Sequence, residues 1–318
     1  MPLPCIIDTD VALDDWMAIL YLLSSPQVDV RAITVAATGE AHAGPGVRTI
    51  QGLLALTTTR GVPVAAGRST PLRGQQAFPL LLRLAMDVRL LLRLPKPLEP
   101  ASTLDAAALL RQEITTSPQP VTIVALGPLT NLAEALLATP SLADMIARIV
   151  IMGGALRVAG NIRELNPRIE NAFAEWNIFC DPYAADVVFQ SGAPITLVPL
   201  DATNQVPLSD AFVEQLAAGP ATPASHFVLR AIQRIQPMLR GQEFYLWDPL
   251  AAVIAVQDGI AISEQIRLRV IQEPGPELGR VVEDPKGGLV NVCLTIDRAA
   301  FEHEYLQRMA RAAGRQDY

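Results

Sequence analysis

The sequence predicts an α/β fold, in which helices flank an open and mostly parallel β-sheet. Short apolar or β-branched runs alternate along the chain with helical segments, the order that βαβ units produce. Half of the 318 residues are hydrophobic but only 5% are aromatic. Ala, Leu, Val and Ile therefore supply most of the apolar content, as is typical of strands that are buried on both faces.

The first third of the chain alternates predicted strands and helices. Residues 4–7 are a short apolar run that ends in acidic residues, and residues 13–23 follow as a helix because Leu13, Met17 and Leu20 lie on one stripe. Next come a strand at residues 28–36, a helical segment at 44–58 and a short strand at 62–65.

The remaining elements continue this alternation. We predict a helix at residues 105–114, with Ser102 or Thr103 as its N-cap. Residues 121–125 are a β-branched strand, which Gly127-Pro128 separates from a helix that runs through Leu137. The last predicted elements are strands at 149–152 and 195–199, helices from Pro223 and from Trp247, and a carboxyl-terminal helix.

We predict a single domain over residues 1–318. The chain contains no repeat and no low-complexity linker, and its length is compatible with one large α/β domain. The stretches rich in Pro and Gly, at residues 68–76, 156–172 and 219–223, are interpreted as long loops. Long loops in compact domains often serve as lids or binding loops.

Composition argues against several classes of partner. The net charge of −7 argues against nucleic-acid binding, which needs a basic surface. Asp8 and Asp10 lie where a signal peptide needs an apolar core, and charges interrupt the leucine-rich residues 80–94. The three cysteines have no metal-binding spacing. We therefore expect a cytoplasmic protein with neither nucleic acid nor membrane as partner.

Four carboxylates follow the first predicted strand, at Asp8, Asp10, Asp14 and Asp15. Ligands of open α/β sheets bind at this carboxyl edge. Asp14 and Asp15 also suit a helix start without any ligand, because the helix dipole favours negative charge there. Four like charges in one short segment nevertheless repel unless a cation or strong donors neutralise them. Oxygen ligands favour Ca²⁺ or Mg²⁺, so we predict a metal site.

These residues resemble the amino-terminal Asp-x-Asp-Pro-Gly-x-Asp-Asp signature of the inosine/uridine-preferring nucleoside hydrolase family. Further segments match the family in order: Gly127-Pro128-Leu129-Thr130-Asn131, Met152-Gly153-Gly154, Ala174-Glu175-Trp176-Asn177 and Trp247-Asp248-Pro249. The matches extend from residue 5 to about residue 255, and five motifs in one order are more specific than any of them alone.

The resemblance implies a calcium-dependent enzyme that hydrolyses the N-glycosidic bond of ribonucleosides to ribose and free base. It implies Ca²⁺ ligands at Asp10, Asp15, the backbone carbonyl of Leu126 and Asp248. Asp10 then acts as general base on a metal-bound water. The family also implies a homodimer or homotetramer that takes a small ribonucleoside as its substrate.

The resemblance further implies a set of substrate contacts. Asp14, Asn161, Glu175 and Asn177 would bind the sugar hydroxyls, Met152 would line the pocket and Asp8 would lie behind the metal ligands. Glu40, in a loop after the second strand, is a candidate ligand of the ribose or its 5′ side. Taken singly, these residues also suit helix starts, turns or solvated positions; their joint occurrence favours a site.

Two departures from the family pattern matter. Val11-Ala12 replaces Pro-Gly, so the loop between Asp10 and Asp14 is expected to take a different shape. Trp247 stands where many relatives have a His proposed to protonate the leaving base, as in the purine-specific branch of the family. We therefore predict that purines are preferred, with Trp247 as a base contact, although simple packing under the late helix is an alternative.

Two other functions fit part of the sequence. A haloacid-dehalogenase-type phosphatase also begins with a strand and Asp-x-Asp, but neither Lys96 nor Lys286 suits the phosphate-binding position of that scheme. A non-catalytic nucleoside- or ribose-binding protein on the same fold needs no general base, which Asp10 supplies. Fold and site alone do not guarantee turnover.

Overall fold

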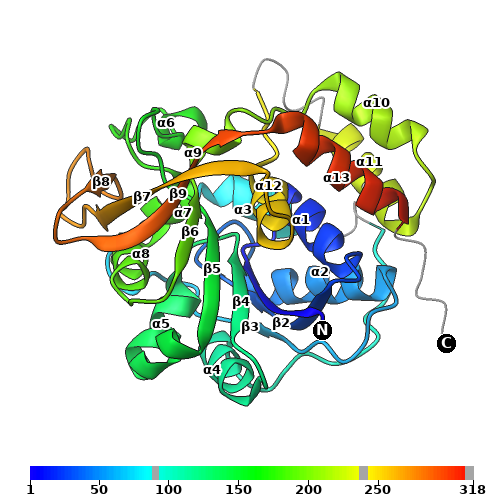
Figure 1. The fold of residues 1–318 in the computed structure, drawn as a ribbon, viewed down its shortest axis with the longest axis horizontal. Helices are drawn as coiled ribbons and strands as arrows, with labels where there is room; N and C mark the ends of the chain where they lie inside the picture. The colour runs from blue at the N-terminus through cyan, green and yellow to red at the C-terminus, as the bar shows by residue number, and fades with distance from the viewer. Residues whose placement is uncertain (88–92, 236–242, 312–318) are drawn as a thin grey trace.

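The computed structural model describes residues 1–87, 93–235 and 243–311 (Figure 1). Its nine strands are β1 (Leu3–Thr9), β2 (Val28–Val35), β3 (Val64–Ala66), β4 (Val121–Ala125), β5 (Ile146–Met152), β6 (Ile195–Val198), β7 (Ala261–Val270), β8 (Val281–Glu283) and β9 (Gly288–Ile296). They form one sheet in the order β3-β2-β1-β4-β5-β6-β9-β7-β8.

The described helices of the first half are α1 (Leu13–Leu23), α2 (Ala43–Leu56), α3 (Leu80–Asp87), α4 (Ala106–Thr116), α5 (Thr130–Ala138) and the 3-10 helix η2 (Pro140–Met145). Those of the second half are α6 (Ile162–Leu165), α7 (Trp176–Cys180), α8 (Pro182–Phe189), α9 (Leu200–Thr203), α10 (Asp210–Ala218), α11 (Pro223–Ile235), α12 (Trp247–Val256) and α13 (Arg298–Arg311). No helix among the described residues is long and apolar enough to cross a membrane.

The sheet is parallel from β3 through β9, while β7 runs antiparallel to both β9 and β8. The predicted α/β architecture with a mostly parallel sheet is therefore confirmed. Each predicted strand lies within one to three residues of an observed one. The prediction for the helix at 105–114 was wrong in its cap: the Asp105 carboxylate, not Ser102 or Thr103, accepts the Ala108 N–H at 2.7 Å.

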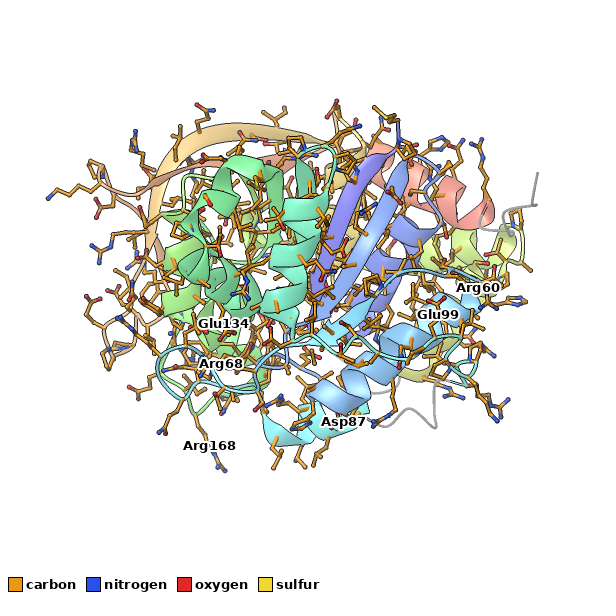
Figure 2. The ribbon with its side chains drawn as sticks, turned by 90° about the horizontal axis from the view of Figure 1, so that it is seen from below. Arg60, Arg68, Asp87, Glu99, Glu134 and Arg168 are labelled. Atoms are coloured by element: carbon orange, nitrogen blue, oxygen red, sulfur yellow. The ribbon has the colours of Figure 1, made fainter. Side chains whose placement is uncertain are left out.

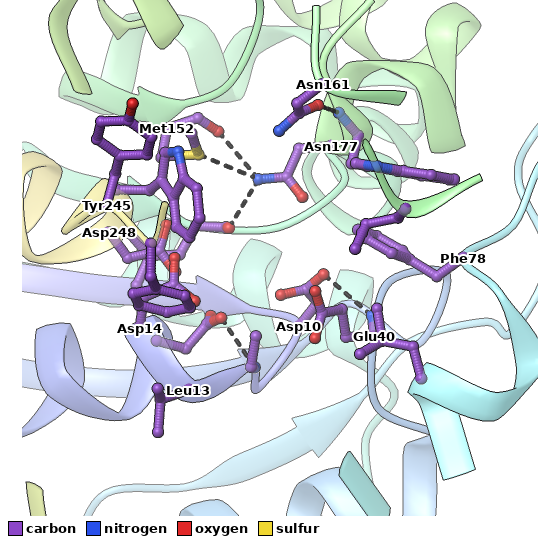
Figure 3. Close-up of a pocket in the computed structure, with 18 of the residues that line it drawn as sticks. Asp10, Leu13, Asp14, Glu40, Phe78, Met152, Asn161, Asn177, Tyr245 and Asp248 are labelled. Atoms are coloured by element: carbon purple, nitrogen blue, oxygen red, sulfur yellow. Dashed lines mark hydrogen bonds between the residues drawn. The ribbon is translucent and has the colours of Figure 1, made fainter. Parts of the chain in front are cut away.

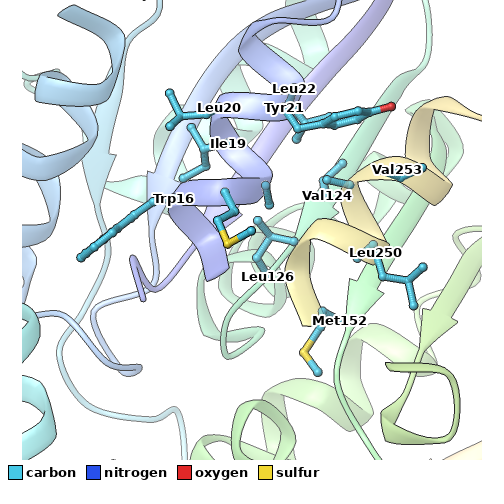
Figure 4. Packing of buried hydrophobic residues seen from close by; sticks show 14 of the residues in the cluster. Trp16, Ile19, Leu20, Tyr21, Leu22, Val124, Leu126, Met152, Leu250 and Val253 are labelled. Carbon is cyan, nitrogen blue, oxygen red and sulfur yellow. The ribbon is translucent and has the colours of Figure 1, made fainter. Parts of the chain in front are cut away.

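Helices cover both faces of the sheet. One apolar cluster packs α1, α11, α12 and α13 against the sheet, and a second cluster packs α4, α5 and α8 against the other face. Figure 4 shows side chains of α1, β4 and α12 meeting in the first cluster, among them Tyr21, Val124 and Val253. Burial of both faces explains why the parallel strands are nearly continuous apolar runs.

Strand register brings the functional segments to one edge. Asp8 of β1 pairs with Thr34 of β2 and with Ala125 of β4, so these three strands end at the same level. Asp10 follows β1 and Leu126 follows β4, while Met152 ends β5. The chain therefore delivers three predicted site positions to the carboxyl edge of adjacent strands, where α/β ligands bind.

Candidate active site

A cavity of about 560 Å³ opens at this edge of the sheet (Figure 3). Every residue predicted to bind metal or substrate lines it: Asp10, Asp14, Asp15, Glu40, Leu126, Met152, Asn161, Glu175, Asn177, Trp247 and Asp248. They come from seven separate segments of the chain. A cavity of this volume is within the range of small-molecule sites.

The loop after β1 is held by its own polar groups. Asp15, in the first turn of α1, accepts the Thr9 hydroxyl through Oδ1 and the Ala12 N–H at 2.9 Å through Oδ2. Asp10 accepts the backbone N–H of Glu40 at 3.0 Å. The loop that carries Glu40 is thereby fixed to the acidic loop, which places three carboxylates at one end of the cavity.

Val11 shows how this loop differs from the Pro-Gly pattern. Its φ is +69°, in the left-handed region that a β-branched residue rarely adopts. The Val11 N–H donates to the Thr9 hydroxyl at 3.1 Å, and its carbonyl accepts the Trp16 indole N–H at 2.9 Å. Trp16 also packs on Phe227 with ring centroids 5.9 Å apart, and it does not line the cavity. Trp16 is therefore a core residue that also holds this loop.

At the closed end of the cavity, where Asp14, Asp15 and Asp248 lie, the carboxylates have no positive partner among the described residues. Oxygens of Asp14, Asp15 and Asp248 lie within 4.8 Å of one another. Burial, and then the charge of Asp15, raises the pKa of Asp14 to about 8 and raises the pKa values of Asp10 and Asp248 well above their usual range. Among the described residues that line the cavity there is no Lys, Arg or His. Such a group is stabilised by a cation or by protons.

The residues present fit a divalent cation with oxygen ligands. Asp248 is 2% exposed, and its Oδ1 has no hydrogen-bond partner among the described residues. Leu126 contributes a buried carbonyl, which accepts the Asn177 amide at 3.0 Å and has a second lone pair to offer. The closest oxygen cluster contains Asp14 where the resemblance implied Asp10, while Asp10 lies beside Asp15 and raises the negative charge there.

The opposite wall of the cavity carries fixed polar groups. Glu175 caps α7 and accepts three backbone N–H groups, from Asn177 at 2.8 Å, Gly154 at 2.9 Å and Ile178 at 3.2 Å. Its carboxylate is therefore rigidly oriented at the cavity. The Asn177 amide nitrogen donates to the carbonyls of Leu126 and of Met152, the latter at 3.3 Å. Its Oδ1 can therefore accept a hydrogen bond from a ligand in the cavity.

Asn161 begins α6 and faces the same wall. Its Oδ1 accepts the Trp176 N–H at 3.2 Å, so its amide nitrogen is left to donate into the cavity. Asp8 is fully buried and does not line the cavity. It accepts Thr34 Oγ1 at 2.6 Å and Asn131 Nδ2 at 2.8 Å, and burial raises its pKa to about 7. Its expected place behind the ligands agrees with these contacts.

Sequence reasoning missed the aromatic and acidic rim. Phe78 stacks on Trp176 with centroids 4.8 Å apart, and Phe244, Tyr245, Glu164 and Glu243 also line the cavity. The run Phe244-Tyr245-Leu246-Trp247, in a chain only 5% aromatic, directly precedes Asp248 and was a usable signal. Phe78 and Glu164 lie in loop-like or very short elements, and the sequence gives no periodicity that marks them.

Helix α3 covers one side of the cavity with Leu82, Ala85 and Met86. Arg83, 7% exposed, anchors this helix by donating to the Ala37 carbonyl at 2.7 Å. At the other end, Asp87 accepts the His42 N–H at 3.1 Å and contacts His42 Nδ1 at 2.6 Å. Both anchors attach α3 to the two sides of the loop that carries Glu40.

We expect Arg83→Met to raise KM for the substrate more than it lowers kcat, because it releases α3 from the Glu40 loop. A hydrogen bond from a charged group contributes about 1.5 to 3 kcal/mol, so the Tm should also fall. Arg60→Met, which removes an exposed arginine far from Asp87 in Figure 2, is the matched control. If steady-state kinetics show the same KM for Arg83→Met as for the unaltered chain, then α3 is held in place without Arg83.

The alternative of a haloacid-dehalogenase-type phosphatase gains no support from the geometry. Lys96 and Lys286 are both exposed, and neither lines the cavity. The scheme needs a cationic side chain beside the first carboxylates, and the described lining supplies none. The acidic end of the cavity instead suits a cation and a polyhydroxylated ligand.

Comparisons with known proteins agree with this geometry. The family model of the inosine-uridine preferring nucleoside hydrolases matches residues 5–303. A pyrimidine-specific ribonucleoside hydrolase RihA from Salmonella arizonae is 38% identical over 69% of this chain and 67% of its own length. A uridine nucleosidase 1 from Arabidopsis thaliana is 40% identical over 64% of this chain, and the match spans 58% of that relative.

Solved structures match over nearly the whole chain. A plant nucleoside hydrolase superposes with a TM-score of 0.86 at 29% identity, covering 98% of this chain and 99% of its own. A purine-preferring ribonucleoside hydrolase from Gardnerella vaginalis gives a TM-score of 0.78 at 29% identity, over 97% of this chain and 98% of its own. With its family motifs gathered in one cavity and the family model matched almost end to end, the chain belongs to the inosine-uridine preferring nucleoside hydrolase family, whose enzymes hydrolyse ribonucleoside N-glycosidic bonds.

Proposed function

We propose that this chain is a Ca²⁺-dependent ribonucleoside hydrolase that releases ribose and a free base, with Asp10 as the general base. The observation that carries the proposal is a set of buried carboxylates at the closed end of a nucleoside-sized cavity, whose described lining contains no positive side chain. Hard oxygen ligands favour calcium over softer metals. The family match supports the reaction type.

Four groups would hold the ion: Asp10, Asp15, Asp248 and the Leu126 carbonyl. Bound Ca²⁺ supplies positive charge that balances these carboxylates and acidifies water at its surface. Asp10 takes the proton of the water that attacks C1′, and the backbone N–H of Glu40 orients its carboxylate for this task. The Asp10 carboxylate is thus the proposed catalytic residue.

The ribose is bound by the polar groups around it. Asp14, Asn161, Glu175 and Asn177 bind its hydroxyls, Glu40 lies on the 5′ side, and Met152 lines the pocket. The fixed carboxylate of Glu175 also stabilises the positive charge that develops on the sugar as the bond breaks. A site built for hydroxyls should reject 2′-deoxyribonucleosides, because buried polar groups are then left unpaired.

The test is a screen for released ribose with common nucleosides, before and after removal of divalent cations. We expect ribose from ribonucleosides, none after chelation, and recovery on addition of Ca²⁺. Tight nucleoside binding without any ribose release would instead identify a non-catalytic binding protein. Hydrolysis that is unchanged by chelation would contradict the calcium dependence.

We also propose a preference for purines, carried by Trp247 at the cavity wall. Aromatic stacking contributes about 0.5 to 1.5 kcal/mol beyond area burial, and a bicyclic base offers the larger face. Purines can be protonated at N7 from solvent, whereas pyrimidines depend more on a positioned acid. The named relatives include both pyrimidine-specific and purine-preferring enzymes. Values of kcat/KM for inosine, guanosine and adenosine should exceed those for uridine and cytidine; the reverse order would contradict the proposal.

A further inference from the structure

In the part of the cavity lining that the structure describes, every side chain that carries a full charge at neutral pH is a carboxylate. Eight carboxyl groups reach it, and the described lining contains no Lys, Arg or His. Five of them serve the metal and sugar in the proposed function, Glu40 lies on the 5′ side, and Glu164 and Glu243 have no role there. Glu164 and Glu243 are therefore left to attract a further positive charge at their part of the cavity.

Glu164 and Glu243 both line the cavity in the neighbourhood of Tyr245. The Tyr245 hydroxyl donates to Glu243, and burial and then the charge of Glu243 raise the pKa of Glu164. Tyr245 and Phe244 pack on Trp247, with ring centroids 5.7 and 4.8 Å away. Carboxylates that flank aromatic faces are the lining that recognises cations with delocalised charge.

The acidic aromatic group contains Trp247, the base contact of the proposed function. Trp247 is adjacent in sequence to the buried Asp248 of the metal cluster. Figure 3 shows Tyr245 on one side of the cavity and Phe78 on the other, with Glu40 on the side of Phe78. Because Trp247 is the base contact in the proposed function, the wall that it forms with Tyr245 is assigned to the base.

We propose that the base end of this cavity selects ribonucleosides whose base carries a positive charge, such as N7-alkylated purine ribosides and pyridinium ribosides. The inference rests on the proposed function and names a substrate class for the same cavity. Glu164 and Glu243 supply the opposite charge, and the faces of Trp247 and Tyr245 supply the cation–π attraction.

Such a base also removes the need for a general acid. The C1′–N bond breaks with its electron pair going to the base, which leaves neutral because the pair cancels its positive charge. The water oxygen bonds to C1′, and the water proton goes to Asp10 and then to solvent. A neutral purine must gain a proton to depart equally well, and no imidazole lines the described cavity to give it.

The test compares charged and neutral substrates in two proteins. In the unaltered chain, kcat/KM for 7-methylguanosine should exceed that for guanosine, but intrinsic reactivity contributes to this difference. The double variant Glu164→Gln/Glu243→Gln decides the matter. It should lower kcat/KM for 7-methylguanosine about fivefold and leave guanosine unchanged, since exposed ion pairs contribute about 0.2 to 1 kcal/mol each. Equal loss for both substrates, or loss for neither, overturns the inference.

The matched control is Glu214→Gln/Glu273→Gln, which makes the same change in net charge at exposed positions outside the cavity. It should leave both substrates unchanged. A second readout needs no turnover: calorimetry with 1-methylnicotinamide, a cation, and nicotinamide, its neutral counterpart. We expect tighter binding of the cation, lost in the Glu164/Glu243 variant.

These two readouts separate the possible failures. Absence of ribose release from every nucleoside refutes the proposed function, while the calorimetry still measures charge selection at the cavity. Ribose release from guanosine together with equal affinity for 1-methylnicotinamide and nicotinamide refutes only the charge selection. In that case Glu164 and Glu243 act as solvated residues of the rim.

Discussion

Asp10→Asn should abolish measurable ribose release while leaving the fold intact. Loss of a general base alone lowers rates by about 10² to 10⁴, and loss of a carboxylate from the proposed ion site adds to that. Asn matches Asp in shape, which matters because the backbone is packed closely on this side chain. A Cβ on Gly39 would lie 2.1 Å from Asp10 Oδ2, and one on Gly127 would lie 2.8 Å from Asp10 Cβ.

Single-turnover kinetics with a purine ribonucleoside measure the effect, and thermal unfolding checks the fold. The control Asp258→Asn makes the same chemical change at an exposed residue outside the cavity, and it should keep full activity. If Asp10→Asn retains activity within tenfold of the unaltered chain, another group accepts the proton of the attacking water. Asp14, whose oxygens lie in the closest acidic cluster, is then the first candidate.

The part of the site that the sequence predicts is the part fixed by strand ends. Asp10, Leu126 and Met152 each follow or end a parallel strand, and parallel strands in one sheet end at the same edge. An acidic run immediately after an apolar one therefore locates the closed end of the cavity without coordinates. The family motifs then add the sugar wall at Glu175 and Asn177.

The rim depends on tertiary placement that local sequence does not encode. Phe78, just before α3, stacks on Trp176 of α7, 98 positions later, and the two belong to one small apolar cluster. Glu164 and Glu243 line the same cavity from a four-residue helix and an extended segment, neither of which has a periodic pattern. Strand β7 was not predicted for a related reason: it mixes charged and apolar residues, and only two of its ten residues are buried.

The loop at Val11 is a third place where the sequence predicts only part of the structure. Its substitution for the family Pro is visible in the sequence, and a changed loop shape was expected from it. The compensating contacts are not visible: the Thr9 hydroxyl and the Trp16 indole hold the backbone at a positive φ. Trp16 thus supports the acidic loop from the core side, a role that the sequence alone does not indicate.

Calcium added to metal-free protein should raise its Tm by about 5 °C or more. A ligand that binds only the folded state at 100 times its Kd contributes about 2.7 kcal/mol, and each kcal/mol raises the Tm of a large domain by about 2 °C or more. The buried Oδ1 of Asp248, which has no partner among the described residues, makes this carboxylate the one that gains most from the ion. Mg²⁺ should give a smaller shift, because it demands six ligands at shorter distances.

Asp248→Asn separates ion binding from a general effect of salt. The neutral amide removes one charge from the cluster with Asp14 and Asp15, so the metal-free variant should be as stable as the metal-free parent or more stable. Calcium should then give it little or no rise in Tm, and ribose release should be lost. A calcium-induced rise as large as in the parent would exclude Asp248 as a ligand. An unaltered Tm in both proteins would mean that the buried carboxylates are balanced by protons, as their raised pKa values allow, and that the closed end of the cavity binds the sugar without a metal.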